Sequence, residues 1–204
     1  MEDIELQSTR KNMALFAVLC LDGGTYNKVK GMLKGDEDYA HVVPINCAFK
    51  TATWINGEPS NKPYLYHYED GSVPDYTRPT LELLDRRPDI VFVVGVLNKS
   101  QADIKHNYLT EIAQQRDLKV ISLLATDAKT SEERLSSIDC SSHPVFFLDK
   151  ENQNENTSIL ELYQALFSII DGQATATIVG LDFGDVKNAF SAQGTGKFDS
   201  IPFN

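Results

Sequence analysis

Polar residues accompany three apolar runs of the sequence, and these positions are the first candidates for ligand binding. Asp22, with two glycines, follows the run MALFAVLCL, Asn46 lies in the run HVVPINC, and Asn98 follows the run IVFVVGVL. Ligands of open α/β sheets bind outside the carboxyl ends of the strands. An enzyme on such a sheet would need a cleft in which these three side chains converge.

Two aspartates near the end of the chain are the second candidates. Asp182 and Asp185 lie in TIVGLDFGDVKNAFSA, which is typical of a strand, a turn and a helix. Taken alone, the pattern favours a structural role, in which Asp182 caps the helix, Phe183 packs beneath it and Asp185 stabilises its N-terminus.

Other groups with potential chemistry are weaker. Cys140 and His143 are close in sequence, but no second pair of ligands accompanies them, so the sequence predicts no metal site. The cysteines at positions 20, 47 and 140 are typical of reduced, buried thiols. The sequence contains no G-x-S-x-G elbow, P-loop or G-x-G-x-x-G motif. We interpret Gly194-Thr-Gly-Lys197 as a loop, because no strand is expected before it.

Strands and helices are expected to alternate along the chain. Apolar runs predict strands at 13–21, 41–47, 90–97, 120–124 and 145–148, with Pro44 indicating a bulge or an edge strand. Asp22 to Thr25 is expected to form a tight turn. Helices are predicted just after this turn, from about Arg78, around 104–113, near 131–135 and at 158–170. Asn56-Gly57 indicates a β-hairpin within residues 50–76. This order predicts an α/β fold with a mostly parallel, Rossmann-like sheet and helices on both faces.

Composition fits one globular domain. The 204 residues are 42% hydrophobic and 24% charged. We expect a flexible lead-in at 1–12, one domain at 13–196 and a tail at 197–204. The net charge of −10 argues against nucleic acid or an anionic membrane as a partner. No apolar run approaches the roughly 20 residues that span a bilayer, and the polar N-terminus is unlike a secretory signal. We therefore expect a cytoplasmic protein.

Three stretches, in the same order, resemble the FtsZ/tubulin family of GTPases. FAVLCLDGGTYNKVKGM resembles the family's first strand, glycine-rich loop and helix, with Gly23, Gly24 and Asn27 matching the loop. DIVFVVGVLNKSQADIKHNYLTEIAQQRDLKVISLLATD aligns without a gap to the segment that carries the second phosphate-binding loop. IVGLDFGDVKNAFSAQG resembles the family's acidic loop, with Asp182 and Asp185 on its acids.

The resemblance implies a GTP or GDP site and a catalytic loop that acts on a neighbouring subunit. Asp182 and Asp185 would orient the water that attacks the γ-phosphate, although Gly180 replaces the family's asparagine. The residues at the positions of the nucleotide site are Gly23, Gly24, Thr25, Asn27, Asn46, Asn98 and Ser100.

The second phosphate-binding loop departs from the family. Its GGGTGTG falls on residues 98–104, which contain no glycine to let backbone N–H groups approach a phosphate. Ser100 and Asp103 are spaced as an N-cap and an acid at the third helical position, which predicts a self-capped helix with a carboxylate at the anion site. Asp22 adds a second charge. Two unit negative charges about 5 Å apart repel by about 3 kcal/mol at an effective dielectric constant near 20.

We therefore expect a divergent FtsZ-like protein with weak or no GTP binding and hydrolysis and no bound cofactor. It would act as a non-catalytic partner or regulator in an FtsZ/tubulin-type system of cell division or the cytoskeleton. Its partner would be an FtsZ-like protein or a second copy of the chain. One alternative is an active, polymer-forming GTPase that binds GTP or GDP. Another is an unrelated Rossmann-like protein that binds a small molecule.

Overall fold

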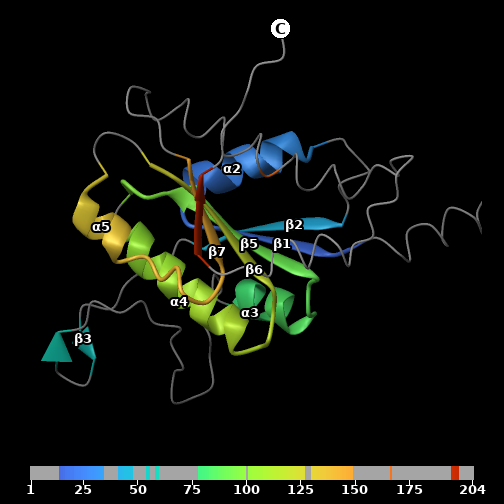
Figure 1. Cartoon of the computed structure of the whole chain (residues 1–204). Coiled ribbons are helices and arrows are strands. Elements are labelled where there is room, and N and C mark those ends of the chain that lie inside the picture. The colour runs from blue at the N-terminus through green and yellow to red at the C-terminus, as the bar shows by residue number, and fades with distance from the viewer. Residues whose placement is uncertain are drawn as a thin grey trace, which may run out of the picture.

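A six-stranded sheet forms the centre of the structure, a computed structural model (Figure 1). The structure describes residues 14–34, 41–47, 54–55, 58–59, 78–99, 101–126, 130–148, 166 and 194–197. Every neighbouring pair of strands in the sheet is parallel. In spatial order the strands are β2 (Val42–Asn46), β1 (Phe16–Cys20), β5 (Ile90–Val96), β6 (Val120–Ala125), β7 (Pro144–Leu148) and β8 (Gly194–Lys197).

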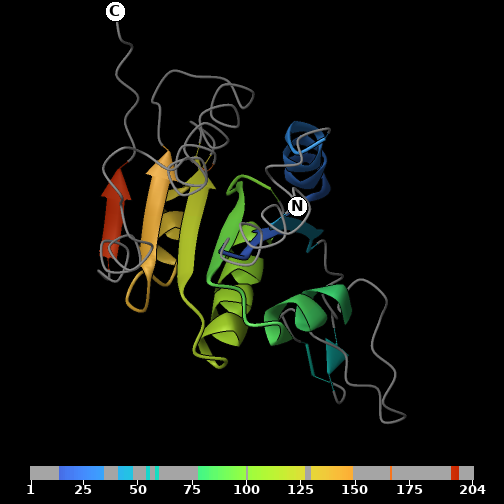
Figure 2. The ribbon, with the colours of Figure 1, turned by 90° about the vertical axis from the view of Figure 1, so that its right-hand side faces the viewer.

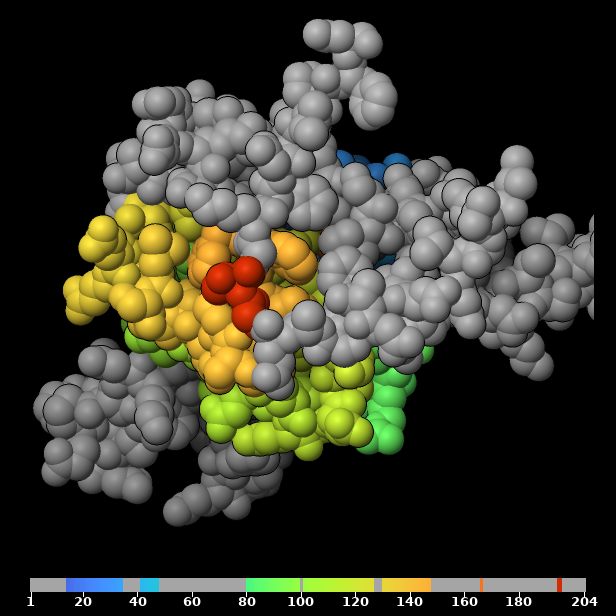
Figure 3. Space-filling view, in the orientation of Figure 1, coloured from blue at the N-terminus to red at the C-terminus, as the bar shows by residue number. Residues whose placement is uncertain are grey.

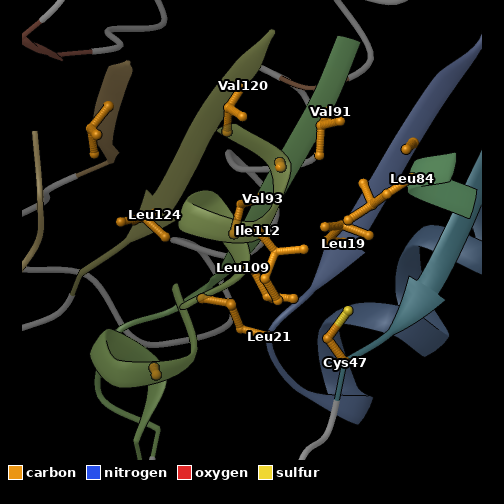
Figure 4. Packing of buried hydrophobic residues seen from close by; sticks show 14 of the residues in the cluster. Leu19, Leu21, Cys47, Leu84, Val91, Val93, Leu109, Ile112, Val120 and Leu124 are labelled. Carbon is orange, nitrogen blue, oxygen red and sulfur yellow. The ribbon is translucent and has the colours of Figure 1, made fainter. Parts of the chain in front are cut away.

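Helices cover both faces of the sheet, because side chains of successive strand residues point to opposite faces. On one face, helix α2 (Gly23–Met32) packs Val29 against a core that includes Phe92 and Leu123. On the other, α3 (Arg78–Asp85) and α4 (Ala102–Gln114) cover a second core. Figure 1 shows α2 on one side of the sheet and α3 and α4 on the other. Figure 4 shows the second core, in which Leu84, Leu109 and Ile112 meet Leu19, Val93 and Leu124 of the strands.

The predicted α/β architecture is confirmed. All residues of β1, β5 and β6 are buried, as their continuous apolar runs predict. Figure 2 shows β5 to β8 side by side, with β5 inside the sheet. β2, which contains Pro44, is an edge strand as expected. Helix α5 (Glu132–Ser136) follows an N-cap at Ser131.

Two predicted elements are described only in part. β3 (Trp54–Ile55) and β4 (Glu58–Pro59) pair antiparallel around Asn56-Gly57, as the turn signal predicts. The rest of the 50–76 segment lies outside the described residues. Of the helix predicted at 158–170, only Leu166 is described; it is helical and fully buried in the core beneath α2.

Two local predictions are wrong. Gly194 to Lys197 is not a loop but strand β8, because pairing with residues 144–147 of β7 overrides the low strand preference of glycine. Figure 3 shows the start of β8 at the surface beside β7, and Thr195 is exposed. Asp22 to Thr25 is not a separate turn, since α2 begins at Gly23.

None of the helices in the described part of the chain combines the length and apolar character needed to cross a bilayer.

Candidate functional site

The carboxyl ends of β2, β1 and β5 lie together at one edge of the sheet. Cys20 at the end of β1 is opposite both Asn46 of β2 and Val94 of β5. The backbone bonds continue past the strands, because the N–H of Leu21 donates to the carbonyl of Val94 at 2.9 Å and that of Cys47 to Cys20 at 2.8 Å. The segments that begin at Asp22 and Asn98 therefore leave neighbouring strands at the same edge, as the sequence predicts.

Asp22 caps helix α2. Its Oδ1 accepts a hydrogen bond from the backbone N–H of Thr25 at 2.8 Å, and its Oδ2 accepts one from the Thr25 hydroxyl at 2.7 Å. Asp22 is the N-cap with extended backbone angles, and Thr25 is the third helical residue. The first N–H groups of a helix have no partner within the helix and carry a partial positive charge. The carboxylate of Asp22 thus occupies the position from which an anion would approach this end of α2.

The two glycines that follow fit closely around this cap. A Cβ added to Gly24 would lie 3.0 Å from Oδ1 of Asp22, which is tighter than ordinary van der Waals contact. A Cβ on Gly23 would lie 3.6 Å from Nδ2 of Asn46, an ordinary contact distance. The capping carboxylate therefore accounts for the glycine at position 24, and Gly23 brings the start of α2 next to Asn46.

The segment between β5 and α4 uses its own backbone groups. The N–H of Leu97 donates to Ala125, that of Lys99 to Val96, and that of Ala102 to the carbonyl of Lys99. The N-cap of α4 is Gln101 in the left-handed region, with φ 59°, and its side chain makes no capping bond. The prediction of a cap formed by Ser100 and Asp103 is thus wrong in its register, although Asp103 does lie in the first turn. Ser100 itself lies outside the described residues.

Arg134 of α5 binds this segment. Its Nη1 donates to the carbonyl oxygens of Leu97 at 2.6 Å and Lys99 at 3.2 Å. Its Nε lies 3.8 Å from Oδ1 of Asp103, whose Oδ2 accepts a bond from the Ser137 hydroxyl at 3.1 Å. The carboxylate of Asp103 therefore interacts with α5 and the residue after it, whereas we expected it at the anion site. One guanidinium joins the end of β5, the start of α4 and α5.

The structure brings together part of the predicted nucleotide site. Gly23, Gly24 and Thr25 form the start of α2, where Thr25 is only 1% exposed, and Asn46 at the end of β2 lies next to Gly23. Asn27 is exposed on α2, and Asn98 is half-buried at the end of β5. The predicted catalytic residues Asp182 and Asp185 lie outside the described residues and stay predictions.

Among the described residues, the cysteines and histidines provide no reactive or metal-binding group at this edge. Burial raises the pKa of the Cys20 thiol, and it raises the pKa of Cys47 to about 12, so both stay protonated near neutral pH. Cys140 donates to the carbonyl of Ile138, and His143 bonds to Ser122. No three histidine, cysteine, aspartate or glutamate side chains within the described ranges are grouped so that they could hold a metal ion.

The fold is similar to those of several solved chains. The chain matches a structure of an FtsZ mutant from M. jannaschii with a TM-score of 0.63 and 14% sequence identity. The match covers 96% of this chain and 68% of the FtsZ chain. The fold is therefore FtsZ-like, and at this identity the likeness shows the fold alone. The sequence matches no protein-family model. The search of curated proteins also gives no match.

Proposed function

We propose that this protein is a non-catalytic member of an FtsZ/tubulin-type system that binds GTP weakly or not at all and acts by contact with a filament-forming partner. The observation that carries the proposal is that backbone N–H groups at the positions of the family's phosphate-binding loops already have acceptors within the chain. Oδ1 of Asp22 holds the N–H of Thr25, and the N–H groups of Lys99 and Ala102 bond to nearby carbonyls. A phosphate would have to displace these bonds and face a carboxylate.

The magnitude of this charge effect favours weak binding. A phosphate about 5 Å from the Asp22 carboxylate is repelled by about 3 kcal/mol per unit charge at an effective dielectric constant near 20. That energy corresponds to a loss of about 100-fold in affinity. In addition, Arg134, whose guanidinium reaches the second loop, already interacts with two carbonyls and Asp103.

A nucleotide titration with matched variants tests the first half of the proposal. GTP with Mg²⁺ is titrated into the full chain by calorimetry. Asp22→Asn keeps a capping oxygen and removes the charge, whereas Asp117→Asn removes an exposed charge on a different part of the protein. We expect no saturable binding below millimolar GTP in the wild type, a clear gain in Asp22→Asn and none in Asp117→Asn. Micromolar binding by the wild type would contradict the proposal and support the active GTPase alternative.

Co-sedimentation tests the second half. The wild-type chain is mixed with GTP-assembled FtsZ from the same organism, and filament pelleting and GTPase rate are measured. The matching of the acidic-loop residues Asp182 and Asp185 to the family supports binding at a filament end. We therefore expect the chain to pellet with filaments or change the GTPase rate, and the double substitution Asp182→Ala, Asp185→Ala to abolish the effect. No binding and no change in rate would exclude this role.

A further inference from the structure

A buried serine joins two histidines on the α4 face of the sheet. Oγ of Ser122 in β6 lies 2.7 Å from Nε2 of His106 in α4 and 2.8 Å from Nε2 of His143, the residue before β7. All three are almost inaccessible, with exposures of 0% for Ser122, 0% for His106 and 3% for His143. The two imidazole rings are tilted by 33° with centroids 5.6 Å apart.

The hydrogen-bond partners determine which nitrogen of each ring carries the proton. Oδ1 of Asn107 accepts from the backbone N–H of Asp139 at 3.1 Å, so the 3.0 Å contact from Nδ1 of His106 to the same oxygen requires an N–H on Nδ1. Nε2 of His106 is then an acceptor for the Ser122 hydroxyl. Because that hydroxyl has one hydrogen, Nε2 of His143 must donate to it.

The contacts of the other ring nitrogen of His143 complete the hydrogen-bond network. Its Nδ1 is then an acceptor, and it lies 3.3 Å from Nε2 of Gln114 and 3.2 Å from Oγ of Ser142. Each nitrogen and the hydroxyl therefore have a suitable partner while both rings are neutral, whereas a proton on Nδ1 of His143 would have only Oγ of Ser142 as an acceptor. A proton on Nδ1 of His143 would face the Gln114 amide donor. A proton on Nε2 of His106 would force the Ser122 hydrogen to lose its acceptor.

The same contacts hold residues 137–143 on α4. Nδ2 of Asn107 donates to the carbonyl of Ser137 at 2.7 Å, and Nε2 of Gln114 donates to Oγ of Ser142 at 2.6 Å. The bond from the Asp139 N–H to Asn107, the contact of His143 with Ser122 and the bond from the Ser137 hydroxyl to Asp103 also fix this segment. The segment lies between α5 and β7, and the helical backbone bonds of α5 reach only its first two residues, Ser137 and Ile138.

We propose that His106, Ser122 and His143 form an acid-sensitive latch that holds residues 137–143 against α4 and β6 and releases them when either ring gains a proton. Asp139 from the segment itself faces both rings and Asp103 from α4 faces His106, and both carboxylates favour protonation. Burial opposes it more strongly and lowers the pKa of each histidine to about 4. The rings regain an ordinary pKa near 6.5 when they meet water.

Linkage gives the size of the effect. Opening that exposes one ring becomes about tenfold more favourable between pH 7.5 and pH 5.5, because the exposed ring then gains a proton that the closed state rejects. The factors multiply to about 100-fold if both rings are exposed. Both pH values lie above the sequence pI of about 4.8, so the chain keeps its negative charge during the measurement.

Hydrogen exchange of the full chain tests the latch. Protection of amides in residues 137–143, corrected for the intrinsic pH dependence of exchange, is compared at pH 7.5 and pH 5.5 with that of β5. We expect the segment to open well before β5 and to lose protection by tenfold or more at the lower pH. His143→Gln can still donate to Ser122 but does not titrate, and should reduce the pH-dependent loss by about tenfold.

A control and a second measurement keep the test decisive. His41→Gln changes a histidine that packs on Phe16, outside the latch, and should leave the pH response of the segment unchanged. If His143→Gln does not fold, the ring signals of the wild type are titrated by NMR instead. Either ring titrating near pH 6.5, or a segment that always opens together with β5, would overturn the proposal.

Discussion

Asp22 and Thr25 form a double hydrogen bond, in which one carboxylate accepts from both the backbone N–H and the hydroxyl of the same threonine. The pair closes the start of α2 at the edge of the sheet where a ligand of this fold would bind. Because Thr25 is 1% exposed, water has little access to compete for these bonds. The same residues thus determine both the stability of α2 and its ability to accept an anion.

Substitution of Asp22 separates these two roles. Asp22→Ala removes both bonds and should lower the free energy of unfolding by about 1 kcal/mol, the usual effect of losing an N-cap. Asp22→Asn keeps a capping oxygen and should lower the free energy of unfolding much less. Urea unfolding of the three proteins at pH 7 measures the difference. Equal stability of the Ala and Asn variants would show that the oxygen does not contribute as a cap.

The positions of the strands could be predicted from the sequence because each central strand is one continuous apolar run. IVFVVGV became β5 and VISLLA became β6 with errors of one residue. A strand buried on both faces is a continuous apolar run, and runs of 7 and 6 residues are too short for a typical buried helix. The start of α2 was also within reach, since Asp22 followed by Thr25 three residues later is a normal N-cap spacing.

The contacts between distant segments could not be predicted. Arg134 is 37 residues from Leu97, and no local pattern indicates which carbonyl an arginine side chain will meet. β8 depends on pairing with β7 and not on its own composition, Gly-Thr-Gly-Lys. One signal was present for the latch: Ser122 is the one polar residue in the run VISLLA, and a buried hydroxyl needs a partner.

Removal of Arg134 should destabilise the segment after β5. Arg134→Ala leaves the carbonyl oxygens of Leu97 and Lys99 without this donor, which we expect to lower the free energy of unfolding by about 1–3 kcal/mol. Arg134→Lys should lower the free energy of unfolding less, because an ammonium group can still donate to a carbonyl.

The ion pair of Arg116 with Asp85 provides the control. Asp85 is 63% exposed, so Asp85→Ala should change stability by less than about 1 kcal/mol. Thermal and urea unfolding of all four proteins give the comparison. A similar small effect for Arg134→Ala would show that its carbonyl bonds are replaced by water.

The histidine pair predicts the pH dependence of global stability. Burial lowers the folded-state pKa of His106 and His143 to about 4, below the value near 6.5 in an unfolded chain. Their contribution is therefore fully present above pH 6.5 and is lost as the pH falls towards 4. As the pH falls through this window, each ring should lower the free energy of unfolding by about 1.4 kcal/mol per pH unit.

Urea unfolding between pH 7.5 and pH 5.5 measures this slope. His143→Gln removes one titrating ring and should reduce the slope by about half, whatever its stability at pH 7.5. A slope that is the same in wild type and variant would assign the pH dependence to other groups.

Two glycines should respond in opposite directions to alanine. A Cβ on Gly95 of β5 would lie 2.6 Å from Cβ and 2.8 Å from Cδ1 of Leu21, so the backbone of one strand end must move. Gly95→Ala should therefore lower the free energy of unfolding by about 1–3 kcal/mol. Gly31 lies in α2 with open space around an added Cβ outside the helix's own backbone, and Gly31→Ala should raise the free energy of unfolding by about 0.5–1 kcal/mol, because alanine favours the helix. Chemical denaturation of both variants at neutral pH measures the two changes. If Gly95→Ala were as stable as the wild type, the Leu21 side chain would not pack against Gly95. That contact would then not help to position the segment that leads into Asp22.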